Sequence, residues 1–291
     1  MALFTASATR RFRYRRLQPS GAIAGAFLAL IAVAAATAPW IAPFDPLAQD
    51  LDNTLALPSA LHWLGTDDLG RDILSRLIFG ARVSLEVGFG SALLSLAIGT
   101  GAGLWAGYRP GLIAGAIMRV SDVLLAFPAV LLAMIVAAVL RAGSGGVLLA
   151  IAVISVPTFV RLAYAVMLAQ RHQAYVEAAQ AFGASSFYII FRSVLPNAVG
   201  PLVVQTAFTV ANAILLEAGL SFLGLGIQPP TPSLGLMLQE ARGYIRSDAW
   251  FGIGPGLTIV AMVLALNSLA DAIAQRADLR SGARGVRQSV L

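Results

Sequence analysis

Long apolar blocks constrain the fold of this 291-residue chain more than any other feature. A bilayer core about 30 Å thick is crossed by about 20 apolar residues in helical form. Six windows of roughly that length contain no charged residue: 21–43, 88–108, 123–140, 142–160, 197–216 and 251–270. The sequence therefore predicts an all-α membrane protein with six transmembrane helices.

The composition excludes several kinds of site. Only 12% of the residues are charged, about half the share found in soluble domains. The chain has no cysteine, which excludes disulfides, thiolate metal sites and a cysteine nucleophile. Its two histidines, His62 and His172, lie far apart in sequence, so no metal site is predicted. The 20 basic residues are all arginines and flank the apolar blocks, so a membrane protein is expected and nucleic-acid binding is not.

The arginines also predict the orientation of the chain, because cytoplasmic segments of membrane proteins carry an excess of basic residues. With the N-terminus inside, 14 of the 20 arginines fall in cytoplasmic segments. Six fall outside, namely Arg71, Arg76, Arg82, Arg141, Arg242 and Arg246. Both termini are therefore predicted to be cytoplasmic.

The first apolar block has two interpretations. Five arginines precede it and Ala36-Thr37-Ala38 resembles a cleavage site, which is the layout of a secretory signal peptide. The block exceeds the usual signal core of about 7–15 residues, so an uncleaved anchor is favoured. The predicted organisation is a basic cytoplasmic tail (1–20), a first transmembrane anchor (21–43), an extracytoplasmic segment (44–83), a core transmembrane domain (84–272) and a cytoplasmic tail (273–291).

The longest predicted cytoplasmic connection runs roughly from Arg161 to Pro196, and its part 171–196 contains a short helix. Residues 173–182 are mostly strong helix formers, and Gly183 follows at a natural helix end. Two adjacent faces carry, respectively, Gln173, Glu177 and Gln180, and Ala174, Ala178 and Ala181. Such an alanine surface lets a partner's groove close around the backbone, where Glu177 can pair with a basic residue. The alternative, a helix resting on the membrane interface, lacks the expected basic face and large apolar stripe.

Small residues recur at every fourth position of the second apolar block, at Gly99, Gly103 and Gly107. This spacing lets two helix backbones approach closely. We expect these glycines to pack against another helix of the same chain, with a second membrane subunit as the alternative. In the third and fourth blocks, Pro128 and Pro157 are expected to bend or break their helices.

Six residues of the cytoplasmic loop form a spaced pattern: Glu177, Ala178, Ala179, Gly183, Leu195 and Pro196. The pattern resembles the EAA loop of ABC-importer permeases, with Ser193 where that motif has an isoleucine. Two further stretches, 62–82 and 217–233, together with Asp122 and Pro128, look like those of the second permease of dipeptide and oligopeptide importers. The resemblance runs from the first span to the sixth.

The resemblance implies a permease subunit of an ATP-driven importer in the bacterial inner membrane, with a type I ABC importer transmembrane domain at 84–272. It implies a second permease, two ATPase subunits and an extracytoplasmic solute-binding protein as partners. The six loop residues would dock the ATPase subunits, which would hold ATP and Mg, and this chain would bind no cofactor. The implied cargo is di- or oligopeptides; nickel chelates, glutathione and opines are alternatives known from similar permeases.

Four more polar residues are candidate pathway or binding-protein contacts. Glu217 is predicted near the outer interface, where it either lines the mouth of the pathway, faces the binding protein or snorkels into the polar region. Asp67, Arg71 and Asp72 lie in the extracytoplasmic segment. They are either a docking element for the binding protein or a local salt-bridged cap on the helix bundle.

No catalytic residues are identified, and the chain is not expected to be an enzyme. It has no G-x-x-x-x-G-K-[ST] loop and no lysine, so ATP binding must lie in another chain. Two other classes stay open: an ion-coupled secondary transporter or channel, and a membrane scaffold. The first needs charges inside the membrane, for which Glu217 and Asp122 are the candidates, both near the ends of spans.

Overall fold

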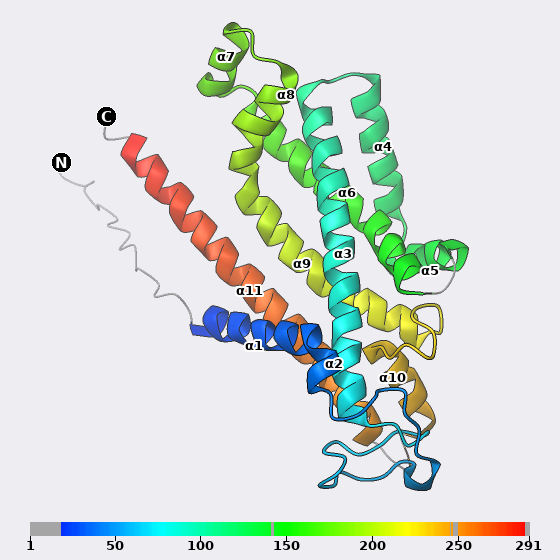
Figure 1. The fold of residues 1–291 in the computed structure, drawn as a ribbon. Helices are drawn as coiled ribbons and strands as arrows, with labels where there is room; N and C mark the ends of the chain where they lie inside the picture. Colours follow the sequence, from blue (N-terminus) through cyan, green and yellow to red (C-terminus); the bar gives the residue numbers. More distant parts are fainter. Residues whose placement is uncertain (1–18, 141–142, 245, 247–249, 289–291) are drawn as a thin grey trace, which may run out of the picture.

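The computed structural model describes residues 19–140, 143–244, 246 and 250–288, with their side chains from residue 21 to residue 276 (Figure 1). Residues 1–18 of the predicted basic tail, and Arg141, lie outside the described residues. Within them the chain consists of helices and loops, with one isolated β-bridge between Thr66 and Asp72. The predicted all-α class is confirmed.

All six apolar blocks are largely helical, and the first and third are each divided between two helices. Four helices are long and apolar enough to cross a bilayer, and they are α3 (Ile73–Tyr108), α6 (Ser144–Gln170), the stretch that ends in α9 (Leu195–Phe222), and α11 (Trp250–Gln288). A bent pair, α4 (Leu112–Ala126) and α5 (Ala129–Leu140), adds a fifth span if counted as one. The first block forms the shorter apolar helix α1 (Pro19–Ala36), so six crossings are compatible with the structure.

The shorter elements gather at the two ends of the long helices. One end carries α7 (Ala174–Ala181), α8 (Ser186–Tyr188) and the π-helix η2 (Ile189–Val194). The other end carries the loops after α2 (Ala38–Ile41), with η1 (Leu51–Asn53), and α10 (Leu234–Ala241) with η3 (Arg242–Tyr244). Figure 1 shows α7 and α8 at the opposite end of α3 from α10. The predicted cytoplasmic loop and extracytoplasmic segment therefore lie at opposite ends of the bundle.

The third apolar block is broken at Pro128, as expected, whereas α6 runs unbroken through Pro157. Helices α4 and α5 meet at Phe127–Pro128 with a bend of 102°. Pro128 has no backbone N–H, and its ring forces the preceding residue out of the helical conformation. Phe127 is accordingly extended, with φ −84° and ψ 142°. The predicted span at 123–140 therefore consists of two helices, and the first of them begins 11 residues earlier than predicted, at Leu112.

The glycine series packs within the chain, as predicted. Helix α3 crosses α6 so closely that a Cβ at Gly103 would lie 2.3 Å from the carbonyl oxygen of Val160. A Cβ at Gly99 would lie 2.6 Å from Cβ of Phe159, and one at Gly107 would lie 2.7 Å from Cβ of Met167. Three successive turns of α3 therefore need glycine for this contact.

We predict that Gly103→Ala destabilises the protein by about 1–3 kcal/mol, the usual cost of overpacking a tight contact. The added methyl group would meet backbone of α6, which cannot rotate away. Gly101→Ala is the matched control, since nothing lies within 4 Å of a Cβ there. Thermal unfolding in detergent should show a lower midpoint for Gly103→Ala only. Equal midpoints for the two variants would show that the α3–α6 contact is looser than described.

Candidate functional site

Helix α7 is a short, defined element of the loop between α6 and α9. The carbonyl group of Gln173 accepts hydrogen bonds from the N–H groups of Val176 (2.8 Å) and Glu177 (3.1 Å), which starts the helix. At the other end Gly183 has φ +77°, a left-handed conformation in which glycine carries no Cβ penalty. Its N–H donates to the carbonyl of Gln180 (2.9 Å), and the next N–H, of Ala184, donates to Ala179 (3.0 Å).

One side of α7 holds the helix onto the bundle and the others are exposed. Val176 is buried in an apolar cluster that includes Met167, Ile190 and Val194. Of the six predicted docking residues, Glu177, Ala178, Gly183 and Pro196 are exposed, whereas Ala179 and Leu195 are half-buried against this cluster. Phe182, at the end of α7, is 92% exposed. The loop therefore presents a surface that combines a carboxylate, small residues and one large aromatic ring.

Polar contacts tie the loop to three long helices. Arg109, directly after α3, donates from Nη2 to Oγ of Ser186 (3.0 Å). The Tyr175 hydroxyl group hydrogen-bonds Gln170 of α6 and accepts from Nδ2 of Asn197 in α9 (3.1 Å). The π-helix η2 then runs directly into α9. A displacement of α7 would therefore be transmitted to α3, α6 and α9.

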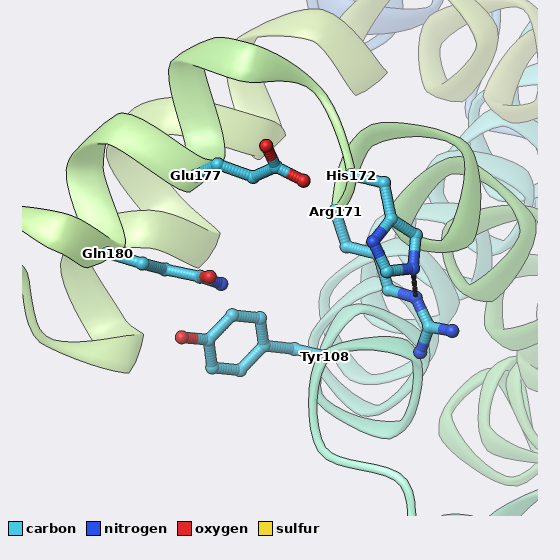
Figure 2. Close-up of a pocket in the computed structure, with 5 residues that line it drawn as sticks. All are labelled: Tyr108, Arg171, His172, Glu177 and Gln180. Atoms are coloured by element: carbon cyan, nitrogen blue, oxygen red, sulfur yellow. Dashed lines mark hydrogen bonds between the residues drawn. The ribbon is translucent and has the colours of Figure 1, made fainter.

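A cleft of about 330 Å³ lies beside α7 and is lined by Tyr108, Arg171, His172, Glu177 and Gln180 (Figure 2). Figure 2 shows the Glu177 carboxylate and the Gln180 amide projecting from α7 into the space in front of Arg171, His172 and Tyr108. Nε of Arg171 donates to Nε2 of His172 (2.9 Å). Among the described residues, Glu177 forms no ion pair, so its carboxylate is available to a cationic side chain of a partner.

At the other end of the bundle, buried ion pairs hold the predicted extracytoplasmic segment. Asp67 accepts from Nε of Arg71 (2.7 Å) and also pairs with Arg76 of α3. Glu240 of α10 pairs with both arginines, at 3.3 Å from Arg71 and 2.9 Å from Arg76. The Asp67, Arg71 and Asp72 side chains are all buried. Of the two interpretations of these residues, the structure shows the salt-bridged cap, with the three side chains turned away from solvent.

Asp72 belongs to the same cap through a second set of contacts. Its Oδ1 lies 2.9 Å from Nδ1 of His62. Its Oδ2 accepts from the Ser75 backbone N–H (2.8 Å) and hydroxyl group (2.7 Å), which is an N-cap of α3. This cap explains why α3 begins at Ile73, 15 residues before the predicted second span at 88–108.

Three carboxyl groups, Asp67, Asp68 and Glu240, converge with their oxygen atoms within 4.8 Å of one another. The guanidinium groups of Arg71 and Arg76 pair with these carboxylates and supply the positive charge that a metal ion would otherwise bring. Burial, followed by the nearby charges of Asp67 and Glu240, raises the pKa of the Asp68 carboxyl above its ordinary value. The charged form of Asp68 is therefore disfavoured in the folded state.

We predict that Asp68→Asn leaves the protein as stable as the wild type at acid pH and makes it more stable than the wild type at neutral pH. The raised pKa means that the native state holds a proton on Asp68 more tightly than the unfolded state does. Wild-type stability therefore falls as pH rises from the ordinary aspartate pKa through the raised one. Thermal unfolding between pH 4 and pH 8 measures this, with the exposed Asp52→Asn as control. Destabilisation by Asp68→Asn at neutral pH would contradict it.

Glu217 lies five residues before the end of α9 with its side chain packed inside the bundle, which corrects the expectation that it snorkels into the polar region. Its side chain is fully buried. Ser84 of α3 donates to its Oε2 (2.7 Å) and Ser221 donates to its Oε1 (2.9 Å). The Ser221 hydroxyl also accepts from the Ile227 backbone N–H (3.0 Å). Glu217 therefore joins α3, α9 and the loop that leads to α10.

The cap and the cleft contain residues that the sequence alone did not identify. Glu240 is 169 residues from Arg71, and no local pattern marks it as a partner. Ser84 and Tyr108 carry no motif of their own. Arg76 lies just beyond Arg71 and Asp72. An arginine next to several aspartates in sequence is a signal that could have indicated an ion-pair cluster.

Comparison with known families matches two parts of the chain. Residues 99–281 match the family described as "binding-protein-dependent transport system inner membrane component". Residues 4–58 match the "N-terminal TM domain of oligopeptide transport permease C". The first match contains the cytoplasmic loop and the second contains α1.

Individual relatives cover nearly the whole chain. It is 43% identical over 269 residues to the dipeptide transport system permease protein DppC of Haemophilus influenzae, covering 90% of this chain and 91% of that one. It is 44% identical over 265 residues to the di/tripeptide permease DppC of Pseudomonas aeruginosa (89% and 88% covered). It is 41% identical over 271 residues to the glutathione permease GsiD of Pectobacterium atrosepticum (92% and 90% covered).

A solved structure shares the fold. An inward-facing form of the MetNI methionine ABC transporter superposes with a TM-score of 0.58 at 20% identity, covering 70% of this chain and 97% of that one. At that identity the likeness concerns the fold alone. It confirms the type I ABC importer transmembrane fold that the sequence predicts.

Proposed function

The chain belongs to the family of binding-protein-dependent transport system inner membrane components, and from this premise we propose that it forms half of a translocation pathway for peptides across the bacterial inner membrane. It is a permease subunit of an ATP-driven ABC importer. The observation that carries the proposal is the exposed surface of α7, which Tyr175 holds by hydrogen bonds to α6 and α9, while Arg109 at the end of α3 bonds Ser186 of the adjoining α8.

The energy for transport is supplied by other chains. With no lysine and no phosphate-binding loop, this subunit does not provide the P-loop lysine of an ATP site. Two separate ATPase subunits hold ATP and Mg, and one of them receives α7 in a groove. Its basic lining pairs with Glu177, and an apolar part accommodates Phe182. Closure of the ATPase pair pulls α7 and, through its contacts, the three long helices.

The opposite end of the bundle faces the extracytoplasmic solute-binding protein. With α7 in the cytoplasm, the buried ion-pair cap of Asp67, Arg71, Arg76 and Glu240 lies on the outer side. The buried cap holds this segment rigidly against the bundle. The binding protein contacts exposed residues of the same segment, among them Leu57, Leu61 and Trp63. A second permease completes the pathway, and both termini lie in the cytoplasm.

Peptides are the proposed cargo, because two relatives at 43% and 44% identity are named for dipeptide and di/tripeptide transport. Glutathione is the second candidate, favoured by the similarity to glutathione permeases. Both solutes carry amide bonds and charged ends, so the same polar groups in a pathway can bind either of them.

Uptake into proteoliposomes tests the proposal. The chain is reconstituted with its second permease and ATPase subunits, with binding protein on the outer side and ATP on the ATPase side. We expect uptake of a radiolabelled dipeptide that requires both ATP and the binding protein. Unlabelled glutathione as competitor distinguishes the two cargoes. Uptake driven by an ion gradient without ATP would overturn the proposal.

A further inference from the structure

An exposed ion pair lies part-way along two membrane helices. Nη2 of Arg161, in α6, is 2.6 Å from Oδ1 of Asp122, in α4, and the two side chains are 52% and 47% exposed. A charged pair that is half exposed at such a position needs a specific environment.

The helix geometry gives the depth of this pair. Arg161 precedes Arg171, at the end of α6, by ten residues, and Asp122 follows Leu112, the start of α4, by ten residues. At about 1.5 Å per residue, each residue lies about 15 Å along its helix from the helix end that is nearer to α7. The neighbouring Val160 contacts Gly103, inside the apolar block 88–108. The pair therefore lies at the level of the inner part of this apolar block, which we place inside a hydrocarbon core about 30 Å thick.

Lipid cannot be the environment of the exposed side of this pair. Ionisable side chains at membrane depth face the bundle interior or a water-filled cavity, since contact with lipid tails costs several kcal/mol. Arg119, one turn before Asp122 on α4, is exposed as well and shares this face of the helix. Val120, on the far side of α4 from Asp122, is 60% exposed and suits lipid. One face of α4 is thus charged and another apolar.

A water-filled pathway suits the charged face better than a dry contact with the second permease. The cores of protein interfaces are depleted of charged residues, and this pair is already neutralised within the chain, so it needs no ion from another subunit. Its exposed N–H groups and carboxylate oxygens still need water or a polar ligand. A guanidinium beside a carboxylate is complementary to a solute that carries one carboxylate and one ammonium group.

We propose that Asp122 and Arg161 line the translocation pathway and bind the charged termini of a zwitterionic solute. This inference rests on the proposed function, because it needs a pathway through this chain. The guanidinium group of Arg161 donates to the solute carboxylate, and Asp122 accepts from the solute ammonium group. When the solute leaves, the two side chains pair with each other again, so neither charge is left uncompensated in the membrane.

Labelling of single cysteines tests the environment without disturbing the pair, because the chain has no native cysteine. Ala126→Cys lies one turn beyond Asp122 on the same face of α4 and is exposed, and Val120→Cys lies on the far side. The reagent is a charged thiol reagent that does not cross membranes, applied to the assembled transporter in two states, without nucleotide and with the ATPases trapped. It should label Ala126→Cys in at least one state and Val120→Cys in neither. An unlabelled Ala126→Cys in both states, or equal labelling of the two, would overturn the inference.

Substrate selectivity tests the binding role. Asp122→Asn and Arg161→Gln should each lower uptake of a free dipeptide by about tenfold or more, the loss expected for one charge-assisted hydrogen bond. For Asp122→Asn the loss should be much smaller for the N-acetylated dipeptide, which lacks the ammonium group. Binding-protein-stimulated ATP hydrolysis shows that each variant is assembled. If assembled variants took up the free dipeptide as well as the wild type does, this inference alone would be wrong. If the wild-type transporter showed no ATP-dependent uptake, the proposed function would be wrong.

Discussion

Gly183→Val is expected to reduce ATP-driven uptake by tenfold or more while the protein still inserts into the membrane. Gly183 has φ +77°, and a β-branched residue held in that conformation costs about 1–3 kcal/mol. The strain opens the end of α7, where Gly183 and Ala184 donate their hydrogen bonds to Gln180 and Ala179. Phe182, next to it and almost fully exposed, then loses its fixed position. ATP hydrolysis should continue without stimulation by the binding protein.

Gly183→Asn is the matched control, because asparagine tolerates the left-handed conformation far better than valine. No atom lies within 4 Å of a Cβ at this position, so side-chain size within this chain cannot explain a difference between the two. Uptake and ATP hydrolysis are measured on the same reconstituted samples. Normal uptake by Gly183→Val would show that the docking surface lies elsewhere.

Arg76→Met is expected to destabilise the protein by about 3–5 kcal/mol, because it leaves buried carboxylates without their counter-charge. Arg76 is 1% exposed and pairs with Asp67 and Glu240. Methionine fills a similar length without the charge. Loss of this arginine should release α10 from the start of α3 and lower the thermal unfolding midpoint strongly, or prevent recovery of folded protein.

The control for this effect is Arg82→Gln, two turns further along the same helix. Arg82 pairs with Glu86 at 2.9 Å, but their side chains are 40% and 60% exposed, and such surface pairs contribute about 0–1 kcal/mol. The two variants remove the same charge from α3, so their difference isolates burial. If both shifted the unfolding midpoint equally, the cap would not be a buried ion-pair cluster. Recovery of stability in the double variant Arg76→Met with Glu240→Gln would support it further.

The sequence predicted those elements whose signals are local. Apolar blocks of membrane-spanning length located every long helix, and the glycines at 99, 103 and 107 predicted the close crossing that α3 makes with α6. The cytoplasmic loop was also predictable, because helix formers, a terminal glycine and Pro196 lie within about 25 residues. The break at Pro128 was signalled by the proline, but the 102° bend depends on the surrounding packing.

Features that depend on distant residues could not be predicted. Glu217 is 133 residues from its partner Ser84 of α3, so counting residues along its own helix could not show that its side chain is buried. Arg161 was assigned to the cytoplasmic loop because the apolar window ends at residue 160. Helix α6 instead continues to Gln170, and Arg161 pairs with Asp122 of α4 part-way along it.

Crosslinking of α7 to the ATPase subunits tests the central claim most directly. Ala178→Cys, exposed on α7, provides a single thiol in a chain that has none, and a short thiol-reactive photocrosslinker is attached to it in the assembled transporter. Leu57→Cys, exposed at the opposite end of the bundle, is the control. The structure predicts crosslinks from position 178 to an ATPase subunit and none from position 57. An absence of crosslinks from position 178, or ATPase crosslinks from position 57, would contradict the assignment of this loop as the docking site.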